Sequence, residues 1–258
     1  MFNQKRKKVI MLYRAKTLSS YKLKGKEGKI GSVEEFYFDD KFWTVRYLVA
    51  DTGNWFVGKQ VLITPYLLTE VDEEESIIRV NLTEEVVENF PTLDSDKPVS
   101  RQFEESYYNY FRLPAYWNGR HMWGAWPYIM REQQEAIVDA KVEESWDPHL
   151  RSTKSVTNYG IHAKDGEIGH VEDFVIDEES WAIRYLIIDT KNWWGGKKVL
   201  ISPHWIDRIS WDELKVYVNL SQESIKQSPE YSEELPVTRE YEELLHRHYT
   251  QKGYWVDE

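Results

Sequence analysis

The chain contains the same segment twice. Residues 28–65 align without a gap onto residues 166–203 at a constant offset of 138, and 21 of the 38 aligned pairs are identical. The offset still holds at Tyr116-Trp117, which match Tyr254-Trp255, so each copy is about 100 residues long. A copy of that length can bury a core of its own, whereas the repeats of a solenoid are only about 20–50 residues long. The duplication therefore predicts two domains of one fold.

The duplication also sets the domain boundaries that we expect. Residues 1–17 form a basic N-terminal segment, and residues 18–117 form the first repeat. Residues 118–155 form a connector that is rich in aromatic side chains, and residues 156–258 form the second repeat. A feature that both copies share belongs to the common fold or to a doubled site, whereas a feature of one copy marks specialisation.

Charge is distributed unevenly along the chain. The first 29 residues carry ten Lys or Arg and one acidic residue, although the whole chain has 44 acidic residues against 33 basic ones. The remaining residues therefore have a strongly negative net charge, which repels the nucleic acid backbone and argues against a nucleic acid partner. The basic run Lys5, Arg6, Lys7 and Lys8 suits either a weak peripheral contact with acidic lipids or a solvated tail.

Composition also limits the compartment and the chemistry. The chain has no cysteine, which excludes disulfides, thiolate metal sites and a cysteine nucleophile. It has no apolar stretch as long as the core of a signal peptide or a membrane-spanning helix. We therefore expect a cytoplasmic protein.

Alternation of apolar and polar residues predicts short strands separated by turn residues. Such a pattern favours a small antiparallel barrel, because closure of the sheet removes exposed edges. The expected fold is mainly β with added helices: two tandem small antiparallel β-barrels, each followed by short helices. The expected strands of the first copy are 29–38, 42–50, 59–64, 67–71 and 77–82, with helices after residue 83 and over 100–111. Those of the second copy are 167–176, 180–188, 197–202, 205–209 and 215–220, with helices over 222–227 and 238–249.

The repeated motifs resemble the PRC-barrel family. They are Gly-x-Ile-Gly, a Val-Glu-Asp/Glu-Phe strand, an Arg-Tyr-Leu strand that ends in Asp-Thr, and Val-Leu-Ile-Ser/Thr-Pro, and they are clearest at residues 166–174 and 199–203. The family is known from the cytoplasmic domain of the photosynthetic reaction centre H subunit and from the C-terminal domain of a ribosome-maturation factor. The whole chain is similar to bacterial two-barrel members. The resemblance implies an adaptor barrel that docks on protein surfaces without catalysis of its own.

This chain departs from both relatives. The reaction centre subunit has a membrane-spanning helix before its barrel, and this sequence shows none. The ribosome-maturation factor has a different N-terminal domain where this chain has a second barrel. Neither relative's role therefore transfers directly, because one fold serves many functions.

Tryptophans in two equivalent turns are the best candidates for protein binding. Asn54-Trp55-Phe56 and Asn192-Trp193-Trp194 follow the same Asp-Thr pair in the two copies. Large rigid aromatic side chains at a hairpin tip make strong interface anchors, although they also suit the role of a cap on the open end of a barrel. The connector adds Trp123 and Trp126 to the candidate docking residues.

Two arginines occupy equivalent positions in the middle of a strand. Arg46 and Arg184 are candidates for an anion site or, more simply, for an internal ion pair with a carboxylate such as Glu34 or Glu172 on the neighbouring strand. The duplication of the glutamates together with the arginines favours the ion pair.

No catalytic or metal-binding constellation emerges from the sequence. The histidines lack the spacing of metal ligands and are expected on the surface or at caps. Adjacent acidic residues on a strand point to opposite faces and cannot form a catalytic pair. We therefore expect no enzyme and no cofactor, but an adaptor for a protein of unknown identity, which includes a second copy of the chain or the cytoplasmic face of a membrane complex. The alternative is a small-molecule or ion-responsive module with a pocket between the barrels, lined by Arg184, Trp193 and His204.

Overall fold

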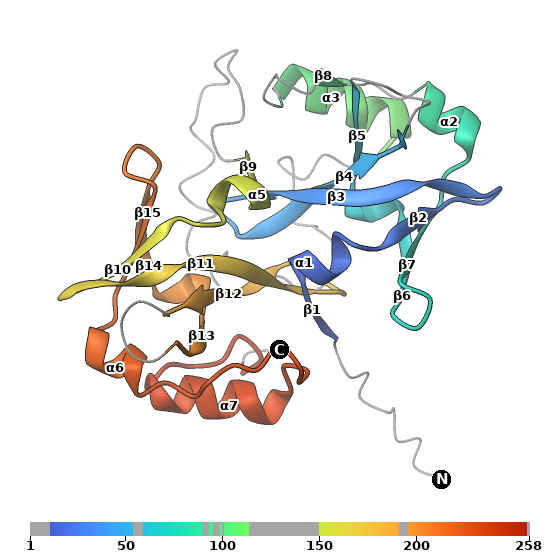
Figure 1. Ribbon diagram of the computed structural model, residues 1–258. Helices are drawn as coiled ribbons and strands as arrows, with labels where there is room; N and C mark the ends of the chain where they lie inside the picture. Colours follow the sequence, from blue (N-terminus) through green and yellow to red (C-terminus); the bar gives the residue numbers. More distant parts are fainter. Residues whose placement is uncertain are drawn as a thin grey trace, which may run out of the picture.

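The computed structural model describes residues 11–53, 59–89, 93–94, 99, 101–113, 150–190 and 196–256. Each repeat forms one sheet, and short helices lie around the two sheets (Figure 1). The expectation of a mainly β protein with added helices and two tandem barrel-like repeats is confirmed. No helix in the described part of the chain is both long and apolar enough to cross a membrane.

The first sheet follows the order β6-β7-β2-β3-β4-β5-β8. Neighbouring strands are antiparallel, except that β2 runs parallel to β7. A 3₁₀ turn, η2 (Pro65–Leu67), and the helices α2 (Glu84–Glu88) and α3 (Arg101–Phe111) follow the strands. The strands are β2 (Lys22–Lys24), β3 (Lys29–Asp39), β4 (Thr44–Asp51), β5 (Lys59–Ile63), β6 (Leu68–Asp72), β7 (Ile77–Val80) and β8 (Leu93–Asp94).

The second sheet repeats this arrangement in the order β13-β12-β11-β10-β15-β14, with β10 parallel to β15. The turn η4 (Pro203–Trp205) and the helices α6 (Gln222–Lys226) and α7 (Arg239–His248) correspond to those of the first repeat. The strands are β10 (Gly160–Ala163), β11 (Gly166–Asp177), β12 (Ile183–Asp189), β13 (Lys198–Ile201), β14 (Ile206–Ser210) and β15 (Lys215–Val218).

Two predicted strands begin later than the sequence pattern indicates. Trp43 and Trp181 were expected inside strands, but their φ angles are +52° and +57°, in the left-handed region that bulky residues rarely adopt. Each tryptophan N–H donates instead to the carbonyl oxygen of the aspartate four residues earlier, at 2.6 Å for Asp39 and 2.8 Å for Asp177. These hydrogen bonds close a turn, so the strand starts only after the tryptophan.

The two repeats exchange their first strands. β1 (Leu12–Arg14) pairs antiparallel with β11 of the second repeat, and β9 (Leu150–Ser152) pairs antiparallel with β3 of the first. The two strands are equivalent at the offset of 138, and each leads into a short helix, α1 (Ala15–Leu18) or α5 (Thr153–Val156). The ranges 1–17 and 118–155, expected to be a basic segment and a connector, therefore contain strands that complete the sheet of the other repeat.

A pseudo-two-fold axis passes between Thr44 and Ala182, which form an antiparallel bridge. On either side of that bridge, the Val45 N–H donates to the Trp181 carbonyl oxygen at 2.9 Å, and the Ile183 N–H donates to the Trp43 carbonyl oxygen at 2.7 Å. Because each tryptophan has a positive φ, its carbonyl oxygen points toward the opposite repeat and accepts one of these hydrogen bonds. Backbone hydrogen bonds therefore join β4 to β12 across the middle of the molecule.

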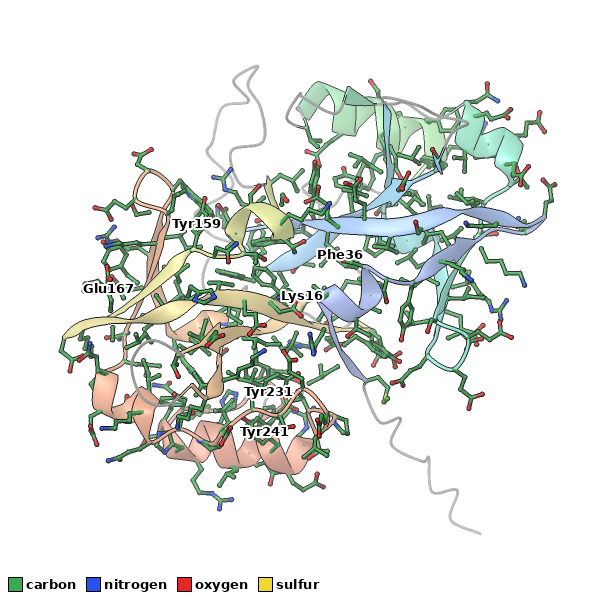
Figure 2. All side chains as sticks on the ribbon, viewed as in Figure 1. Lys16, Phe36, Tyr159, Glu167, Tyr231 and Tyr241 are labelled. Carbon is green, nitrogen blue, oxygen red and sulfur yellow. The ribbon has the colours of Figure 1, made fainter. Side chains whose placement is uncertain are left out.

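Apolar side chains form one core that includes both repeats. The ring centroids of Phe38 and Phe174 lie 5.6 Å apart, and those of Phe36 and Trp181 lie 6.4 Å apart. Phe36 is completely buried, and Figure 2 shows it in the central part of the molecule. The repeats are thus two halves of one packed unit.

Charged side chains hold each exchanged strand in place. The Arg14 Nε donates to Asp173 Oδ2 at 3.2 Å, and the Lys16 Nζ lies 3.6 Å from Glu172. At the equivalent positions of the other exchange, Ser152 donates to Glu35, and the Lys154 Nζ lies 2.8 Å from Glu34. The side chain of Asp173 is only 2% exposed, so loss of a hydrogen-bond partner would leave a buried carboxylate oxygen unsatisfied and lower the stability of the folded state.

We predict that replacing Gly169 by alanine destabilises the protein by about 3 kcal/mol. Its φ is +146°, and a Cβ there would lie 2.1 Å from the backbone oxygen of Asp189. Both the strain and the clash involve backbone, which a rotamer change does not relieve. Urea unfolding at equilibrium measures the loss.

Gly160→Ala is the matched control. The nearest atom to a Cβ at that position is the Lys215 Cγ, at 3.7 Å. We expect a change of less than about 1 kcal/mol in either direction. Equal losses for the two substitutions would contradict the proposed close approach of β11 to β12.

We also predict that Arg14→Ala lowers the free energy of unfolding by about 2 kcal/mol and reduces hydrogen-exchange protection in the second repeat. The change leaves the buried carboxylate of Asp173 without its arginine, although residue 14 precedes the first repeat in sequence. Lys16→Ala is the control, because the Lys16 side chain is 48% exposed and should contribute less than about 1 kcal/mol. Loss of protection in the first sheet alone would contradict the strand exchange.

Candidate functional site

Each of the two predicted arginines forms a buried ion pair with an aspartate. The Arg46 Nη2 lies 3.1 Å from Asp39 Oδ2, and the Arg184 Nη2 lies 2.5 Å from Asp177 Oδ2. The other carboxylate oxygen of Asp39 accepts hydrogen bonds from the N–H groups of Lys41 and Phe42. The aspartate thus fixes the turn between two strands, and the arginine neutralises the charge that this places in the interior.

The expectation that Glu34 and Glu172 are the partners is wrong. Glu34 pairs with Lys154, and Glu172 pairs with Lys16 and Lys198. The reason lies in the hairpin geometry. Asp39 and Thr44 are paired residues beside the turn, so the aspartate reaches Arg46 two residues farther along the strand.

The second repeat contains a buried polar network that the sequence analysis did not identify. The Tyr185 hydroxyl on β12 and the Tyr254 hydroxyl near the C-terminus each lie 2.9 Å from Glu242 Oε1 on α7. The Arg239 Nη1, one turn earlier on the same helix, lies 3.0 Å from Glu242 Oε2. Glu242 is 2% exposed, and burial raises the pKa of its carboxyl group, an effect that Arg239 and the two tyrosines oppose.

His246 extends this network. Its Nε2 lies 2.9 Å from the Tyr185 hydroxyl, and its Nδ1 lies 2.9 Å from the carbonyl oxygen of Lys252. Trp205 and Trp255 pack against the imidazole at centroid distances of 5.1 and 4.9 Å. Burial lowers the pKa of His246 to about 4.

His246 was expected on the surface or at a cap, and the structure corrects this, because its side chain is 4% exposed. A sequence signal was present. Glu242 and His246 are four residues apart on a predicted helix, which places them on one face. Glu242 and Tyr185 also recur at the offset of 138, as Glu104 and Tyr47.

The described residues of the first repeat contain the tyrosine–glutamate contact of this network, with a different residue at the position of the histidine. The Tyr47 hydroxyl donates to Glu104 Oε1 at 2.8 Å, as Tyr185 can to Glu242. At the position of His246 the first repeat has Tyr108, whose hydroxyl lies 3.4 Å from Thr64 Oγ1. The tyrosine–glutamate contact therefore belongs to the common fold, whereas the histidine is a specialisation of the second repeat.

Residues 251–256 cover the network from the C-terminal side. The Gln251 N–H donates to the carbonyl oxygen of His246 at 2.9 Å. The guanidinium carbon of Arg184 lies 3.8 Å from the ring centroid of Tyr254, and that of Arg239 lies 4.2 Å from the Trp255 ring. Aromatic side chains of this C-terminal segment thus stack on the buried Arg184 and on Arg239, whose side chain is 33% exposed.

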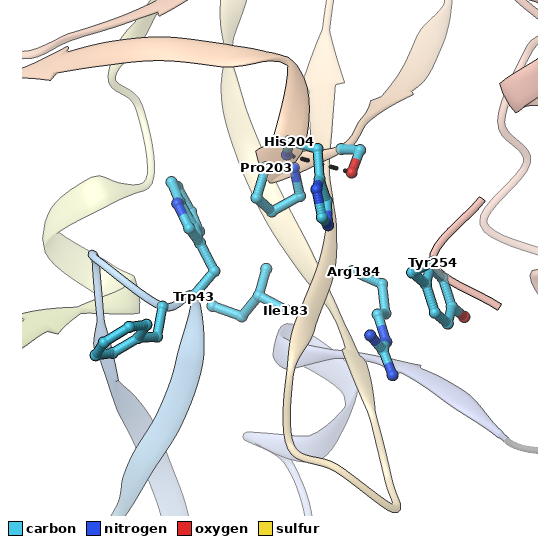
Figure 3. A pocket seen from close by; sticks show the side chains of 8 residues that line it. Trp43, Ile183, Arg184, Pro203, His204 and Tyr254 are labelled. Atoms are coloured by element: carbon cyan, nitrogen blue, oxygen red, sulfur yellow. Dashed lines mark hydrogen bonds between the residues drawn. The ribbon is translucent and has the colours of Figure 1, made fainter. Parts of the chain in front are cut away.

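A small crevice lies where the repeats meet (Figure 3). Arg184 and His204, two of the three residues named for the alternative pocket, line it together with side chains of the first repeat, whereas Trp193 lies outside the described residues. The cavity measures about 10 Å³, room for no more than about one water molecule, whereas pockets for small molecules measure about 300–1,000 Å³. Its lining residues are Phe42, Trp43, Ile183, Arg184, Ser202, Pro203, His204 and Tyr254.

The predicted docking residues lie outside the described part of the chain. These are Trp55, Phe56, Trp123, Trp126, Trp193 and Trp194, and the basic residues Lys5, Arg6, Lys7 and Lys8 lie outside it as well. The structure does describe the strands that lead to two of these groups. Paired strands β4 and β5 flank residues 54–58, and paired strands β12 and β13 flank residues 191–195.

Within the described ranges, no group of three or more His, Cys, Asp or Glu side chains is placed to hold a metal ion. The buried carboxylates of Asp39, Asp177 and Glu242 lie instead against arginines, tyrosines and backbone N–H groups.

Comparison with known proteins agrees with the internal duplication. The family model for the PRC-barrel domain matches the chain twice, at residues 24–87 and 161–224. The first range runs from the last residue of β2 into the helix α2, and the second runs from β10 into the helix α6. No curated protein matches the chain. The chain therefore belongs to the PRC-barrel family and carries the PRC-barrel domain twice.

Proposed function

We propose that this protein is a non-catalytic adaptor with two docking ends, one on each repeat. The adaptor acts in the cytoplasm and binds other proteins or the cytoplasmic face of a membrane complex. The main observation in favour of this proposal is that β4 and β12 extend in opposite directions from the pseudo-two-fold axis.

The bridge between Thr44 and Ala182 is antiparallel, so β4 and β12 run in opposite directions from it. β4 continues to Asp51, and β12 continues to Asp189. At a rise of about 3.3 Å per residue, straight strands of this length would separate the two ends by at most roughly 46 Å. The chain therefore enters the segments 54–58 and 191–195, which contain the tryptophans, from opposite ends of the joined strands β4 and β12.

Two separated binding ends suit a protein that connects partners. Tryptophan supplies large contact areas at little cost in conformational entropy, and it is frequent among the residues that dominate interface energies. Two ends on one rigid unit also allow one partner to raise the local concentration of another. A second copy of this chain is one candidate occupant.

The internal polar contacts support the non-catalytic part of the proposal. Arg46 and Arg184 are neutralised by aspartates in the same hairpins, and Glu104 and Glu242 lie against tyrosines in both repeats. Because these contacts occur twice, they are better explained by the common fold than by a reaction at one place. The size of the crevice near His204 also makes the small-molecule alternative less attractive than the adaptor.

The test is an affinity retention experiment with immobilised protein and native cell extract. We expect at least one specific protein to be lost when Trp55 and Phe56 are changed to alanine, and the same or another to be lost when Trp193 and Trp194 are changed. A difference between the retained sets of the two variants would assign a separate partner to each end. Light scattering of wild type and variants identifies a second copy as partner.

Leu244→Ala is the control, because Leu244 is a large apolar residue on α7 that is 50% exposed and lies away from both turns in sequence. It should leave retention unchanged. Thermal unfolding of every variant checks that the fold is intact. Identical retention by the wild type and by both double variants would reject the adaptor with tryptophan ends.

A further inference from the structure

The buried network of the second repeat contains more hydrogen-bond contacts than ordinary protonation states can fill. Four contacts of 2.9 Å join Tyr254 to Glu242, Glu242 to Tyr185, Tyr185 to His246, and His246 to the carbonyl oxygen of Lys252. Each contact needs one hydrogen between its two heavy atoms.

An ionised Glu242 and a neutral His246 supply only three hydrogens. Each tyrosine hydroxyl contributes one, and the neutral imidazole contributes one, which the Lys252 carbonyl requires because it can only accept. The single hydrogen of the Tyr185 hydroxyl can then be donated either to Glu242 or to His246, but not to both. In the other contact, which has no hydrogen, the lone pairs of two acceptor atoms face each other at 2.9 Å in the interior.

We propose that the chain of Glu242, Tyr185 and His246 is a proton-binding site that holds one additional proton at neutral pH, and that this proton fastens residues 251–256 to the second repeat. The ligand is a single hydrogen ion. No bond other than hydrogen bonds changes when it binds or leaves.

Two positions accommodate the additional proton. On Glu242 it donates to the Tyr185 oxygen, and Tyr185 donates to the Nε2 of His246. On His246 the Nε2–H donates to Tyr185, and Tyr185 donates to Glu242. Both arrangements fill all four contacts with the same number of protons.

The surrounding charges act on both arrangements. Arg239 lies 3.0 Å from Glu242 and favours its ionised form, whereas burial raises the pKa of this carboxyl and lowers that of His246. Arg184 packs against the Tyr254 ring, but its charge is balanced by Asp177. His204 interacts electrostatically with His246, and the Tyr249 ring packs against Trp205, which covers the imidazole.

The C-terminal segment depends on the filled network. Lys252 is held through His246, and Tyr254 is held through Glu242. Loss of the proton breaks one of the inner contacts and lets the imidazole or the carboxylate turn away from Tyr185. Either movement loosens the attachment of residues 251–256.

The first repeat provides an internal comparison. Tyr108 stands where the second repeat has His246, and a phenol accepts no further proton at ordinary pH. At this position the described part of the first repeat therefore has a phenol where the second repeat has an imidazole. The proposed proton-binding site is assigned to the second repeat.

The first test compares the pH dependence of stability for the wild type and Glu242→Gln. Glutamine has the shape of a protonated glutamate and donates to Tyr185 without titrating. A folded state that holds the additional proton has a site pKa above that of the unfolded residues, so its stabilisation is present at low pH and is lost as pH rises. Above about pH 6.5, where an unfolded histidine is neutral, the folding equilibrium constant of the wild type should fall about tenfold per pH unit relative to the variant, until the site itself deprotonates.

Glu104→Gln is the matched control and should follow the wild-type dependence. The same slope in wild type and Glu242→Gln, or the same change for both glutamine variants, would overturn the proposal. Hydrogen exchange of Gln251, corrected for the intrinsic pH dependence, reports on the fastening. Its protection should fall with rising pH in the wild type and stay constant in Glu242→Gln.

Two spectroscopic readouts identify the proton directly at pH 7. Infrared difference spectra between wild type and Glu242→Gln reveal a protonated carboxyl, and nitrogen chemical shifts of His246 reveal an imidazolium. Detection of either group supports the proposal. An ionised Glu242 together with a neutral His246 would overturn it even if the stability data were affected by other groups.

Discussion

The architecture depends on two backbone hydrogen bonds at the centre of the molecule, in which Trp43 and Trp181 each offer a carbonyl oxygen to the other repeat. These carbonyls are available because the tryptophans have a left-handed conformation, which costs roughly 1–3 kcal/mol for a non-glycine residue. The strain is tolerated because Asp39 and Asp177 close each turn from within and are themselves neutralised by buried arginines. A local turn motif thus determines how the two repeats are joined.

Internal symmetry explains which parts of the fold could be predicted from the sequence. The long strands β3, β4, β11 and β12 have β-branched and aromatic residues bounded by turn residues, and the repeat allowed each to be checked against its copy. The short strands β1 and β9 could not be predicted, because three residues carry too little periodicity and their partners lie in the other repeat. The start of β4 was misplaced because alternation continues through Trp43, although the hydrogen bond to Asp39 ends the strand there.

The contacts of the candidate site could likewise be predicted only in part from the sequence. The pairing of Arg46 with an acidic residue was expected from its position in the middle of a duplicated strand, but the choice of Asp39 over Glu34 depended on the register across the turn. Tyr185, Glu242 and His246 are far apart in sequence, and only the packing of α7 on β12 brings them together. The presence of His246 at the position equivalent to Tyr108 is a sequence difference that pointed to different chemistry in the two copies.

The exchange of β1 and β9 has a meaning beyond the stability of the two sheets. The strand that precedes each repeat pairs with the sheet of the other repeat, and this reciprocal exchange is the arrangement of a domain-swapped dimer. A protein made of one repeat would have to find a second molecule to complete its sheet, and its folding would depend on its concentration. Joining the two repeats in one chain makes the exchange intramolecular, so this molecule retains the symmetry of a dimer while its two ends are free to diverge.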